Sequence, residues 1–352
     1  MLIIYLFILF CLYSSLATEY KNQLLIKCSF LAVCAILTIA AGLRDEELWG
    51  DTLKYIDAYK FDVPTFNNFN LSVEVDAYSE KGFILLSSII KSFTSNEKIY
   101  FLVISVLTFV FLIIDFRKFS MFPLLGLCVY ISRFYIGRNL IQIRAGLAIA
   151  IAMLCIYYVH KKQLLKYLLV ILIASIFHTS MLIIIPFYWI NKLKINKIHV
   201  VVCLLAAFFV AAFLTPYLRP YITDIAVDMN YTNYVDSYKA YGVGLSNPMI
   251  YYQSALLLLF TFYQTKIQDK FEYYIEVRNA YLYSTIFLIV LSQWAIASGR
   301  LSTIFATFEI AIIPSFLCLF NHHFRWFAYL MISLCVSMIF YMNYSSHVFN
   351  NL

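Results

Sequence analysis

Apolar runs of about 16 to 27 residues recur from one end of this 352-residue chain to the other. A helix needs roughly 20 consecutive apolar residues to cross the hydrocarbon core of a bilayer. The chain is 63% hydrophobic and only 13% charged, with a mean hydropathy of +0.81, whereas soluble domains carry about 25% charged residues. These features predict an all-α, polytopic integral membrane protein of about ten spans, or 10–12 transmembrane or re-entrant helices, in a single domain covering residues 1–352.

The basic residues predict the orientation of the spans. The formal net charge is +7, and most Lys and Arg form short clusters between apolar runs, which is typical of topology signals and argues against a nucleic-acid partner. Cytoplasmic loops carry the excess of Lys and Arg, so both termini are expected outside. The clusters expected on the cytoplasmic side are Lys21–Lys27, Arg117–Lys118, His160–Lys166, Lys192–Lys197, Lys266–Arg278 and His322–Arg325.

Two long connections are then expected on the outer side. The first, residues 44–80, is rich in acids and aromatics, and the second, residues 217–248, is rich in Tyr and Asn. Loops of this length are usually functional or disordered. Their aromatic content favours ordered caps at the membrane interface, and the alternative is a simple aromatic belt.

The run from Leu164 to Ile190 interrupts the alternation of sides because basic clusters flank both of its ends. His178-Thr179-Ser180 and Pro186 interrupt the run itself. We therefore expect a broken or re-entrant pair of short helices with His178 near the bend, since irregular backbone survives in a membrane only where protein or water surrounds it.

Arginine side chains occur where the charge bias disfavours them. Under this topology Arg44, Arg133, Arg138, Arg144 and Arg300 fall at outer ends of spans or within them, where burial of a charge is costly. One interpretation is intramolecular pairing with acids of the first loop, or snorkelling in the case of Arg133. The other is a set of bidentate donors for phosphate.

The sequence spacing of the arginines limits which of them can lie close together. Arg138 and Gln142 share a face of a continuous helix, but Arg144 points elsewhere. These side chains converge only if the chain bends, and Gly137 is a candidate position for the bend.

Three side chains are candidate proton acceptors: His178, Asp51 and Glu80, in that order. Each also has a plain structural interpretation, as a packing histidine or as carboxylates that face water. The chain lacks a Walker loop, an H-E-x-x-H sequence and a G-x-S-x-G sequence, which argues against ATP hydrolysis and zinc proteolysis. The eight cysteines are scattered singly and indicate neither a metal site nor a disulfide framework.

The order of these motifs resembles the EpsG family of Wzy-type polysaccharide polymerases of the bacterial inner membrane. The chain departs from the family pattern where it has Asp51-Thr52 in place of Thr-Asp, and Ala145 in place of a Gln. The matching patches are Gly42-Leu43-Arg44, Trp49-Gly50-Asp51-Thr52 with Tyr55 and Tyr59, Glu80-Lys81-Gly82-Phe83, Ile143-Arg144 with Ala148, Phe177-His178-Thr179-Ser180 with Pro186, and Arg300 ahead of Ile313-Pro314.

This resemblance implies glycosyl transfer on the periplasmic side, in the assembly of O-antigen, capsule or exopolysaccharide. The donor would be a growing glycan on undecaprenyl pyrophosphate, and the acceptor a single lipid-linked repeat unit. The resemblance implies that the reaction needs no cofactor and no metal. It also implies that a separate co-polymerase sets the length of the polysaccharide. The site residues expected are His178, Asp51 or Glu80 for catalysis, and Arg44, Arg138, Gln142, Arg144, Arg300, Tyr55 and Tyr59 for binding the pyrophosphate and the substrate.

Two alternatives belong to other functional classes. A lipid-linked oligosaccharide flippase also needs cations in a cavity, but such proteins typically contain internal repeats, and none is visible here. A membrane-bound sugar O-acyltransferase would use a histidine such as His178, and it would leave the arginines unexplained.

Overall fold

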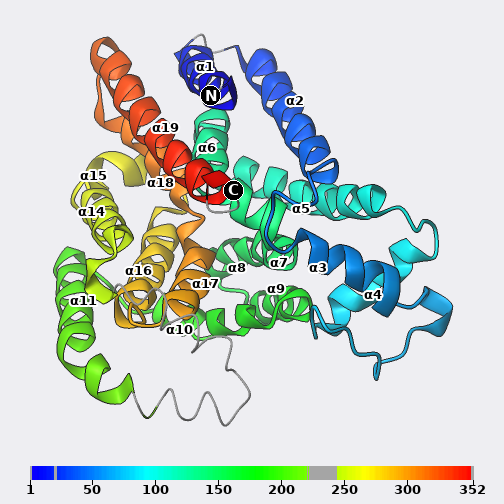
Figure 1. The fold of residues 1–352 in the computed structure, drawn as a ribbon. Coiled ribbons are helices and arrows are strands. Elements are labelled where there is room, and N and C mark those ends of the chain that lie inside the picture. The colour runs from blue at the N-terminus through cyan, green and yellow to red at the C-terminus, as the bar shows by residue number, and fades with distance from the viewer. Residues whose placement is uncertain (1, 20–21, 220, 222–243, 350–352) are drawn as a thin grey trace. The chain divides into compact units, whose positions relative to one another are not determined.

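The computed structural model describes residues 2–19, 22–219, 221 and 244–349, and every regular element in this part of the chain is a helix (Figure 1). The predicted all-α membrane fold is confirmed. Most of the second outer loop, with Tyr231, Tyr234, Tyr238 and Tyr241, lies outside the described residues.

Five helices are long and apolar enough to cross a membrane, or six if a bent pair counts as one span. The chain is therefore a multi-pass membrane protein, while the expected total of ten to twelve spanning or re-entrant helices stays a prediction. The five are Gln23–Gly42, Glu97–Phe119, Ile143–His160, Lys197–Arg219 and Arg325–Ser345, the bent pair is Ala297–Ala306 with Glu309–Leu319, and the shorter apolar helices are Leu6–Ala17, Leu164–Phe177, Thr179–Ile190 and Pro248–Phe262.

The chain divides into two compact units, and the expectation of a single domain stays a prediction. Unit 1 comprises residues 1–155, 165–182 and 309–352. Its elements are α1 (Leu2–Glu19), α2 (Gln23–Gly42), α3 (Thr52–Asp57), the π-helix η1 (Ala58–Asp62), the 3₁₀ helix η2 (Phe66–Asn68), α4 (Lys81–Lys91), α5 (Glu97–Phe119), α6 (Pro123–Tyr130), the π-helix η3 (Ile131–Ile141), α7 (Ile143–Met153), α9 (Leu164–Phe177), the start of the 3₁₀ helix η4 (Thr179–Ile184), α18 (Glu309–Ser315), the 3₁₀ helices η8 (Phe316–Leu319) and η9 (His322–Phe324), and α19 (Arg325–Phe349).

Packing in unit 1 joins segments that are distant in sequence. Helix α5 packs on α2 and on α7, and α6 packs on α18. The first and last helices, α1 and α19, lie side by side in Figure 1 and are in contact. Long-range contacts of this kind hold the helix ends of unit 1 in fixed positions, and the candidate site uses three of those ends.

Unit 2 comprises residues 156–164 and 183–308. Helix α16 is its centre, because α11, α14 and α17 all pack against it. Its elements are α8 (Cys155–His160), α10 (Phe187–Ile190), α11 (Lys197–Phe209), the π-helix η5 (Val210–Leu214), the 3₁₀ helix η6 (Gly244–Ser246), α14 (Pro248–Phe262), α15 (Gln264–Ile267), the 3₁₀ helix η7 (Gln268–Lys270), α16 (Tyr274–Val290) and α17 (Ala295–Ala306).

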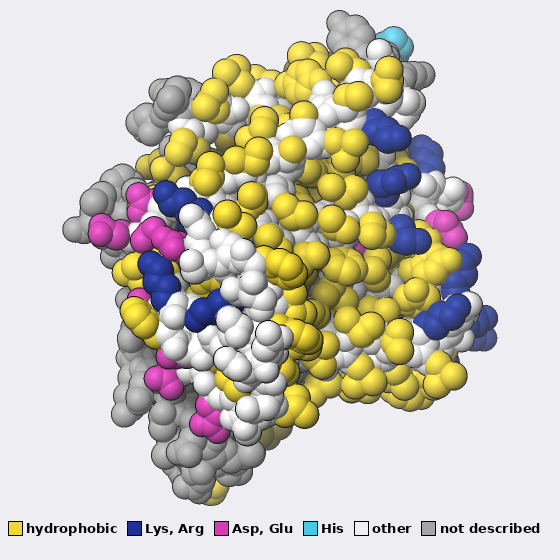
Figure 2. Space-filling model, turned by 90° about the vertical axis from the view of Figure 1, so that its right-hand side faces the viewer, with side chains coloured by type: hydrophobic (Ala, Val, Ile, Leu, Met, Phe, Trp, Pro, Cys, Tyr) yellow, Lys and Arg dark blue, Asp and Glu magenta, His cyan; other side chains and the backbone are white. Residues whose placement is uncertain are grey.

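The outer surface of the helices carries large apolar side chains. Leu24, Ile36 and Ile39 of α2 are exposed by 72%, 63% and 52%, and hydrophobic side chains cover much of the face in Figure 2. Exposed apolar area on this scale is unfavourable in water. It is the surface expected of helices in contact with lipid.

The connection of residues 44–80, predicted to be an outer loop, is ordered and packs onto the helices. It contains α3, η1 and η2, and Tyr55 and Tyr59 are buried in one hydrophobic cluster with residues of α4 and α5. Phe61 and Phe66 of the same loop are exposed. The loop is thus a folded cap whose aromatic side chains divide between the core and the surface.

The segment 164–190 breaks at the expected position. Helix α9 ends at Phe177, and the backbone continues from His178 into the 3₁₀ helix η4. His178 N–H still bonds to the carbonyl of Ala174, and Met181 N–H bonds back to the carbonyl of His178. The chain therefore tightens at His178, while the re-entrant path and the side of the membrane stay predictions.

Candidate functional site

Four side chains from four separate segments of unit 1 meet in one polar cluster. Glu80 stands directly before α4, Arg144 is the second residue of α7, His178 follows α9, and Tyr55 lies in α3. We call these four residues the Glu80 cluster. It brings together two of the three predicted proton acceptors and one of the predicted arginines.

Glu80 and His178 meet because α4 approaches α9 closely. A Cβ on Gly82 would lie 2.7 Å from the carbonyl oxygen of Ile176, so only glycine allows this approach. It places Glu80 Oε1 2.9 Å from His178 Nδ1. The side chains of Glu80 and His178 are 5% and 13% exposed, so the pair is largely shielded from solvent.

This contact sets the tautomer of the histidine. The carboxylate of Glu80 accepts a hydrogen bond, so Nδ1 of His178 must carry the hydrogen. In a neutral ring Nε2 then has the free lone pair. The rings of Tyr55 and Tyr78 pack against each other, with their centres 5.9 Å apart.

Arg144 holds the second oxygen of the same carboxylate. Its Nη1 pairs with Glu80 Oε2, and its Nε donates to the Tyr55 hydroxyl over 3.1 Å. The guanidinium carbon lies 5.3 Å from the centre of the Tyr78 ring. The side chain is 20% exposed, and no described residue occupies its Nη2, which is the part of the fork that remains for a ligand.

The position of Arg144 depends on a break in the helix. The helix breaks at Gln142, where φ is −98° and ψ is 63°. Gly137, the position expected for a bend, lies five residues earlier within the π-helix η3. Gln142 itself forms the junction between η3 and α7 and is partly buried.

The electrostatics of the cluster favour an ionised carboxylate. Burial by itself would raise the pKa of Glu80, but the hydrogen bond with His178 and the positive charge of Arg144 outweigh it and lower the pKa to about 2. Burial raises the pKa of the Tyr55 hydroxyl, which Arg144 opposes. At neutral pH Glu80 is therefore an ionised carboxylate between the guanidinium of Arg144 and the ring of His178, with the neutral phenol of Tyr55 beside them.

Arg44 occupies a neighbouring but different environment. Its Nε and Nη1 donate to the carbonyls of Ala41 and Leu140 over 2.7 and 2.8 Å, and its guanidinium lies 4.0 Å from the centre of the Phe101 ring. Burial lowers the pKa of Arg44 to about 10. A pairing of Arg44 with Asp45 or Asp51, one of the two interpretations of the sequence, is absent from the described contacts. Two nitrogens of its guanidinium instead bond to carbonyls at the ends of α2 and η3.

The remaining predicted residues are distributed over several places. Arg138 is buried with its guanidinium 4.4 Å from the Phe134 ring centre, and Asp51 forms a 3.5 Å contact with Lys54 at the surface. Tyr59 stacks on Tyr100 at 4.1 Å and donates to the carbonyl of Thr94, so it does not join the Glu80 cluster. Arg300 lies in α17 of unit 2, and its role in the site stays a prediction.

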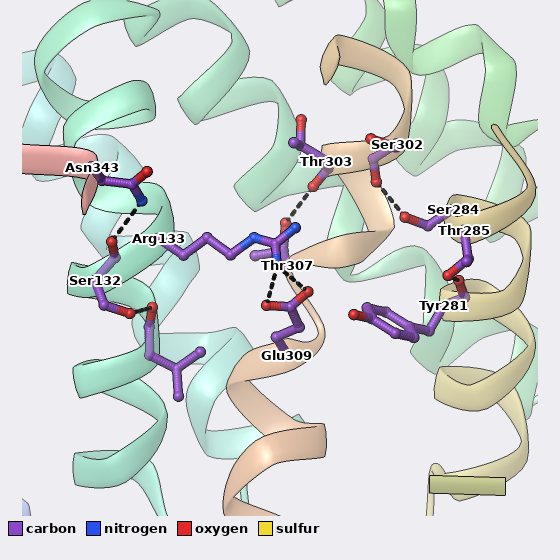
Figure 3. A network of polar contacts seen from close by, with 11 residues as sticks. Ser132, Arg133, Tyr281, Ser284, Thr285, Ser302, Thr303, Thr307, Glu309 and Asn343 are labelled. Atoms are coloured by element: carbon purple, nitrogen blue, oxygen red, sulfur yellow. Dashed lines mark hydrogen bonds and ion pairs between the residues drawn. The ribbon is translucent and has the colours of Figure 1, made fainter. Parts of the chain in front are cut away.

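Two residues near the predicted arginines were not anticipated. Tyr78 precedes Glu80 by two residues, and an extended chain places such residues on one side. Glu309 pairs with Arg133 at 2.7 Å in the interior of unit 1 (Figure 3). Glu309 is the single acid in an apolar run, and that was the signal available in the sequence. Arg133 is thus paired within the protein, but with an acid of α18 and not of the first loop, and not by the snorkelling expected for it.

In the part of the chain that the structure describes, no group of three or more His, Cys, Asp or Glu side chains is placed to hold a metal ion. The chemistry available from the Glu80 cluster is proton acceptance at Nε2 of His178 and donation to an anion from Arg144. Both side chains are partly accessible, with 13% of His178 and 20% of Arg144 exposed.

Comparison with known proteins gives a consistent assignment. The family model of the EpsG family matches residues 27–351. The chain is also 24% identical over 306 residues to the amylovoran biosynthesis protein AmsC of Erwinia amylovora, covering 82% of this chain and 78% of that protein. No solved structure matches the chain. Since the family model covers nearly the whole sequence, the chain belongs to the EpsG family.

Proposed function

We propose that the protein polymerises lipid-linked oligosaccharide repeat units into an exopolysaccharide by glycosyl transfer. Membership of the EpsG family and the similarity to a protein named for amylovoran biosynthesis support a role in exopolysaccharide polymerisation. The donor is a glycan on undecaprenyl pyrophosphate, and the acceptor is a hydroxyl on another lipid-linked unit. The site faces the periplasm from the inner membrane of a bacterium.

One observation carries the mechanism: Glu80 holds Nδ1 of His178 at 2.9 Å and thereby leaves Nε2 as the proton acceptor. Glu80 is then a positioning residue and not the base. A carboxylate in this position fixes both the orientation and the tautomer of the imidazole, and it stabilises the imidazolium that forms. The low pKa of Glu80 supports this division of roles, since a carboxylate with a pKa of about 2 is a weak base.

In the proposed transfer, His178 Nε2 takes the proton of the acceptor hydroxyl, and the acceptor oxygen bonds to the anomeric carbon of the donor sugar. The bond between that carbon and the pyrophosphate oxygen breaks, and undecaprenyl pyrophosphate leaves with the bonding electrons. Negative charge therefore grows on the pyrophosphate in the transition state, where fixed cationic donors are most effective.

Arg144 is the donor best placed for that charge. Its Nη2 has no described partner, and its Nη1 and Nε are anchored by Glu80 and Tyr55, so the side chain is oriented before a ligand arrives. Pre-orientation of this kind costs no reorganisation during the reaction. Arg44 donates to the carbonyl of Leu140, close to the junction of η3 and α7 from which Arg144 projects. Arg138, Gln142 and Arg300 remain candidate ligands of the pyrophosphate.

The test is a reconstituted reaction. Purified protein in liposomes with undecaprenyl-pyrophosphate-linked repeat units should produce a ladder of longer lipid-linked glycans, with His178→Gln protein as the matched control. A flippase would move the repeat unit across the bilayer without lengthening it. An O-acyltransferase would add an acyl mass when given an acyl donor, and neither product pattern is compatible with our proposal.

A further inference from the structure

A groove of about 620 Å³ lies in unit 2, on the segment that joins α10 to α11 and on the facing side of α16. Its volume falls within the range of ligand sites, roughly 300–1,000 Å³. Its walls include Leu193, Cys203, Leu282 and Ile286, and no Asp or Glu is among its described lining residues. The groove is separate from the Glu80 cluster, which belongs to unit 1.

The polar side chains gather at one end of the groove. Arg278 Nη2 donates to the carbonyl of Ile195 over 2.6 Å and fixes the start of α16 beside the segment before α11. Lys194, His199 and Asn279 line the groove near this anchor, whereas Cys203 and Ile286 lie further along the two helices. The groove is thus amphipathic, with a polar end and an apolar end.

Two of these three side chains can donate to an anion, and the hydroxyl of Tyr283, which also lines the groove, donates to the carbonyl of Ile183. Lys194 is exposed and has no ion-pair partner among the residues that the structure describes. His199 Nδ1 accepts the N–H of Asn196 over 3.2 Å, so Nε2 carries the ring hydrogen and is a donor. Asn279 is committed elsewhere, since it donates to Asn191 and accepts from Arg278. The polar end therefore presents cationic and N–H donors without a compensating carboxylate.

We propose that this groove binds one anionic glycerophospholipid, with the phosphate at Lys194 and His199 and an acyl chain along Leu193, Leu282 and Ile286. Basic pockets between transmembrane helices are known to hold anionic lipid headgroups. Helix α11 opens the candidate span Lys197–Arg219, and its Ile198 and Val202 are 70% and 55% exposed. The groove therefore adjoins a lipid-facing surface.

The ligand must match both the polar end and the apolar end of the groove. A free phosphate would use the polar end and leave the apolar wall uncovered. A zwitterionic lipid would bring an ammonium group close to Lys194, which repels it. An anionic lipid satisfies both ends. This inference goes beyond the proposed polymerisation and does not rest on it.

Lys192 provides a matched control from the same segment. Its Nζ lies 4.6 Å from the centre of the Tyr188 ring, and it lines a different cavity of about 410 Å³. Lys192→Gln and Lys194→Gln remove the same charge two residues apart, so a general attraction of the basic segment for anionic lipid would weaken equally in both variants.

The experiment is native mass spectrometry of the delipidated full chain with added phosphatidylglycerol or phosphatidylethanolamine of identical acyl chains. The wild type should retain one phosphatidylglycerol in preference to phosphatidylethanolamine. Lys194→Gln should lower that retention about fivefold, the effect of one lysine near a lipid phosphate, and Lys192→Gln should leave it unchanged. Cys203→Phe, which fills the apolar end, should lower the retention of both lipids.

Three results would overturn the proposal. Equal retention of the two lipids by the wild type would show that the headgroup is not recognised. Equal losses of retention in Lys192→Gln and Lys194→Gln would show a general attraction of the basic segment for anionic lipid instead of a defined site. Unchanged retention in a Cys203→Phe protein that unfolds at the wild-type temperature would show that the acyl chain does not occupy the groove. Both lysine variants are at exposed positions, so a failure to fold cannot mask the outcome.

Discussion

The division of labour between His178 and Glu80 can be tested with a double-mutant cycle. The single variants are His178→Gln and Glu80→Gln, and the third protein carries both changes. General-base catalysis contributes about 10²–10⁴-fold in rate, which corresponds to roughly 2.7–5.4 kcal/mol at 1.36 kcal/mol for each factor of ten. His178→Gln should therefore lose at least about a hundredfold in turnover.

The two effects should not add. Glu80 contacts His178 at 2.9 Å, and in our proposal it acts on the acceptor hydroxyl only through that ring. Once His178 is absent, Glu80 has no proton acceptor to orient. Because Glu80 also anchors Nη1 of Arg144, part of its loss should remain, so the double variant should lose less than the product of the two single losses.

The assay is the rate of glycan elongation per folded molecule in liposomes, with the folded fraction taken from size-exclusion chromatography in detergent. Asp51→Asn is the control carboxylate, because Asp51 contacts Lys54 at the surface, and it should keep a near-normal rate. If Glu80→Gln is inactive while His178→Gln elongates normally, Glu80 is the base. Losses that multiply in the double variant would show that the two residues act independently.

Three further predictions follow from the same geometry. The pKa of Glu80 is about 2 in the folded protein against an ordinary 4.5, so its stabilisation is present above about pH 4.5 and is lost as the pH falls towards 2. The melting temperature should drop over this window, and Glu80→Gln should reduce the drop. Arg144→Lys keeps the positive charge but loses the forked guanidinium, so turnover per folded molecule should fall at least tenfold. Arg44→Lys should lower mainly the melting temperature, because Arg44 bonds to two backbone carbonyls. Gly82→Ala should slow elongation by separating α4 from α9, while Gly50→Ala, with nothing within 4 Å of the added Cβ, should not. Elongation at the wild-type rate by Gly82→Ala would contradict the role of that close approach.

The fold class was predictable because lipid imposes a strict rule. Backbone polar groups in hydrocarbon must be paired within the segment, so repeated apolar runs of sufficient length leave few alternatives to helices. The break at His178 was predictable for a related reason, since His178-Thr179-Ser180 and Pro186 interrupt an otherwise continuous run. These inferences need only local sequence.

The partners within the site were not predictable in the same way. Glu80 and His178 are 98 positions apart, and Arg144 and Tyr55 are 89 apart. Their convergence depends on the packing of α4, α7 and α9, which no local pattern encodes. The position of the helix break at Gln142 instead of Gly137 has the same origin, because π-helical hydrogen bonding extends η3 to Ile141.

The arginines show this limit most clearly. These arginines were selected because the sequence places them at the predicted outer ends of spans. The role of each one depends on which groups its guanidinium contacts in the folded protein. Arg44 faces carbonyls left over at the ends of α2 and η3, and Arg133 faces Glu309. Arg144 also faces a carboxylate, and 20% of its side chain is exposed. Nη2 of Arg44 has no hydrogen-bond partner either, but it is buried, so exposure and not pairing alone separates the two arginines.

The location of the cluster at helix ends bears on its substrate. Glu80 directly precedes α4, Arg144 is in the first turn of α7, and His178 directly follows α9. Helix ends offer unpaired backbone groups, which suit charged side chains and anionic ligands. The negative charge of Glu80 is also favoured before the N-terminus of α4. In our proposal the pyrophosphate of the donor lies beside these helix ends, with its sugar outside the hydrocarbon and its isoprenoid inside. A site built at helix ends can therefore reach the scissile bond of such a donor without drawing the glycan into the membrane.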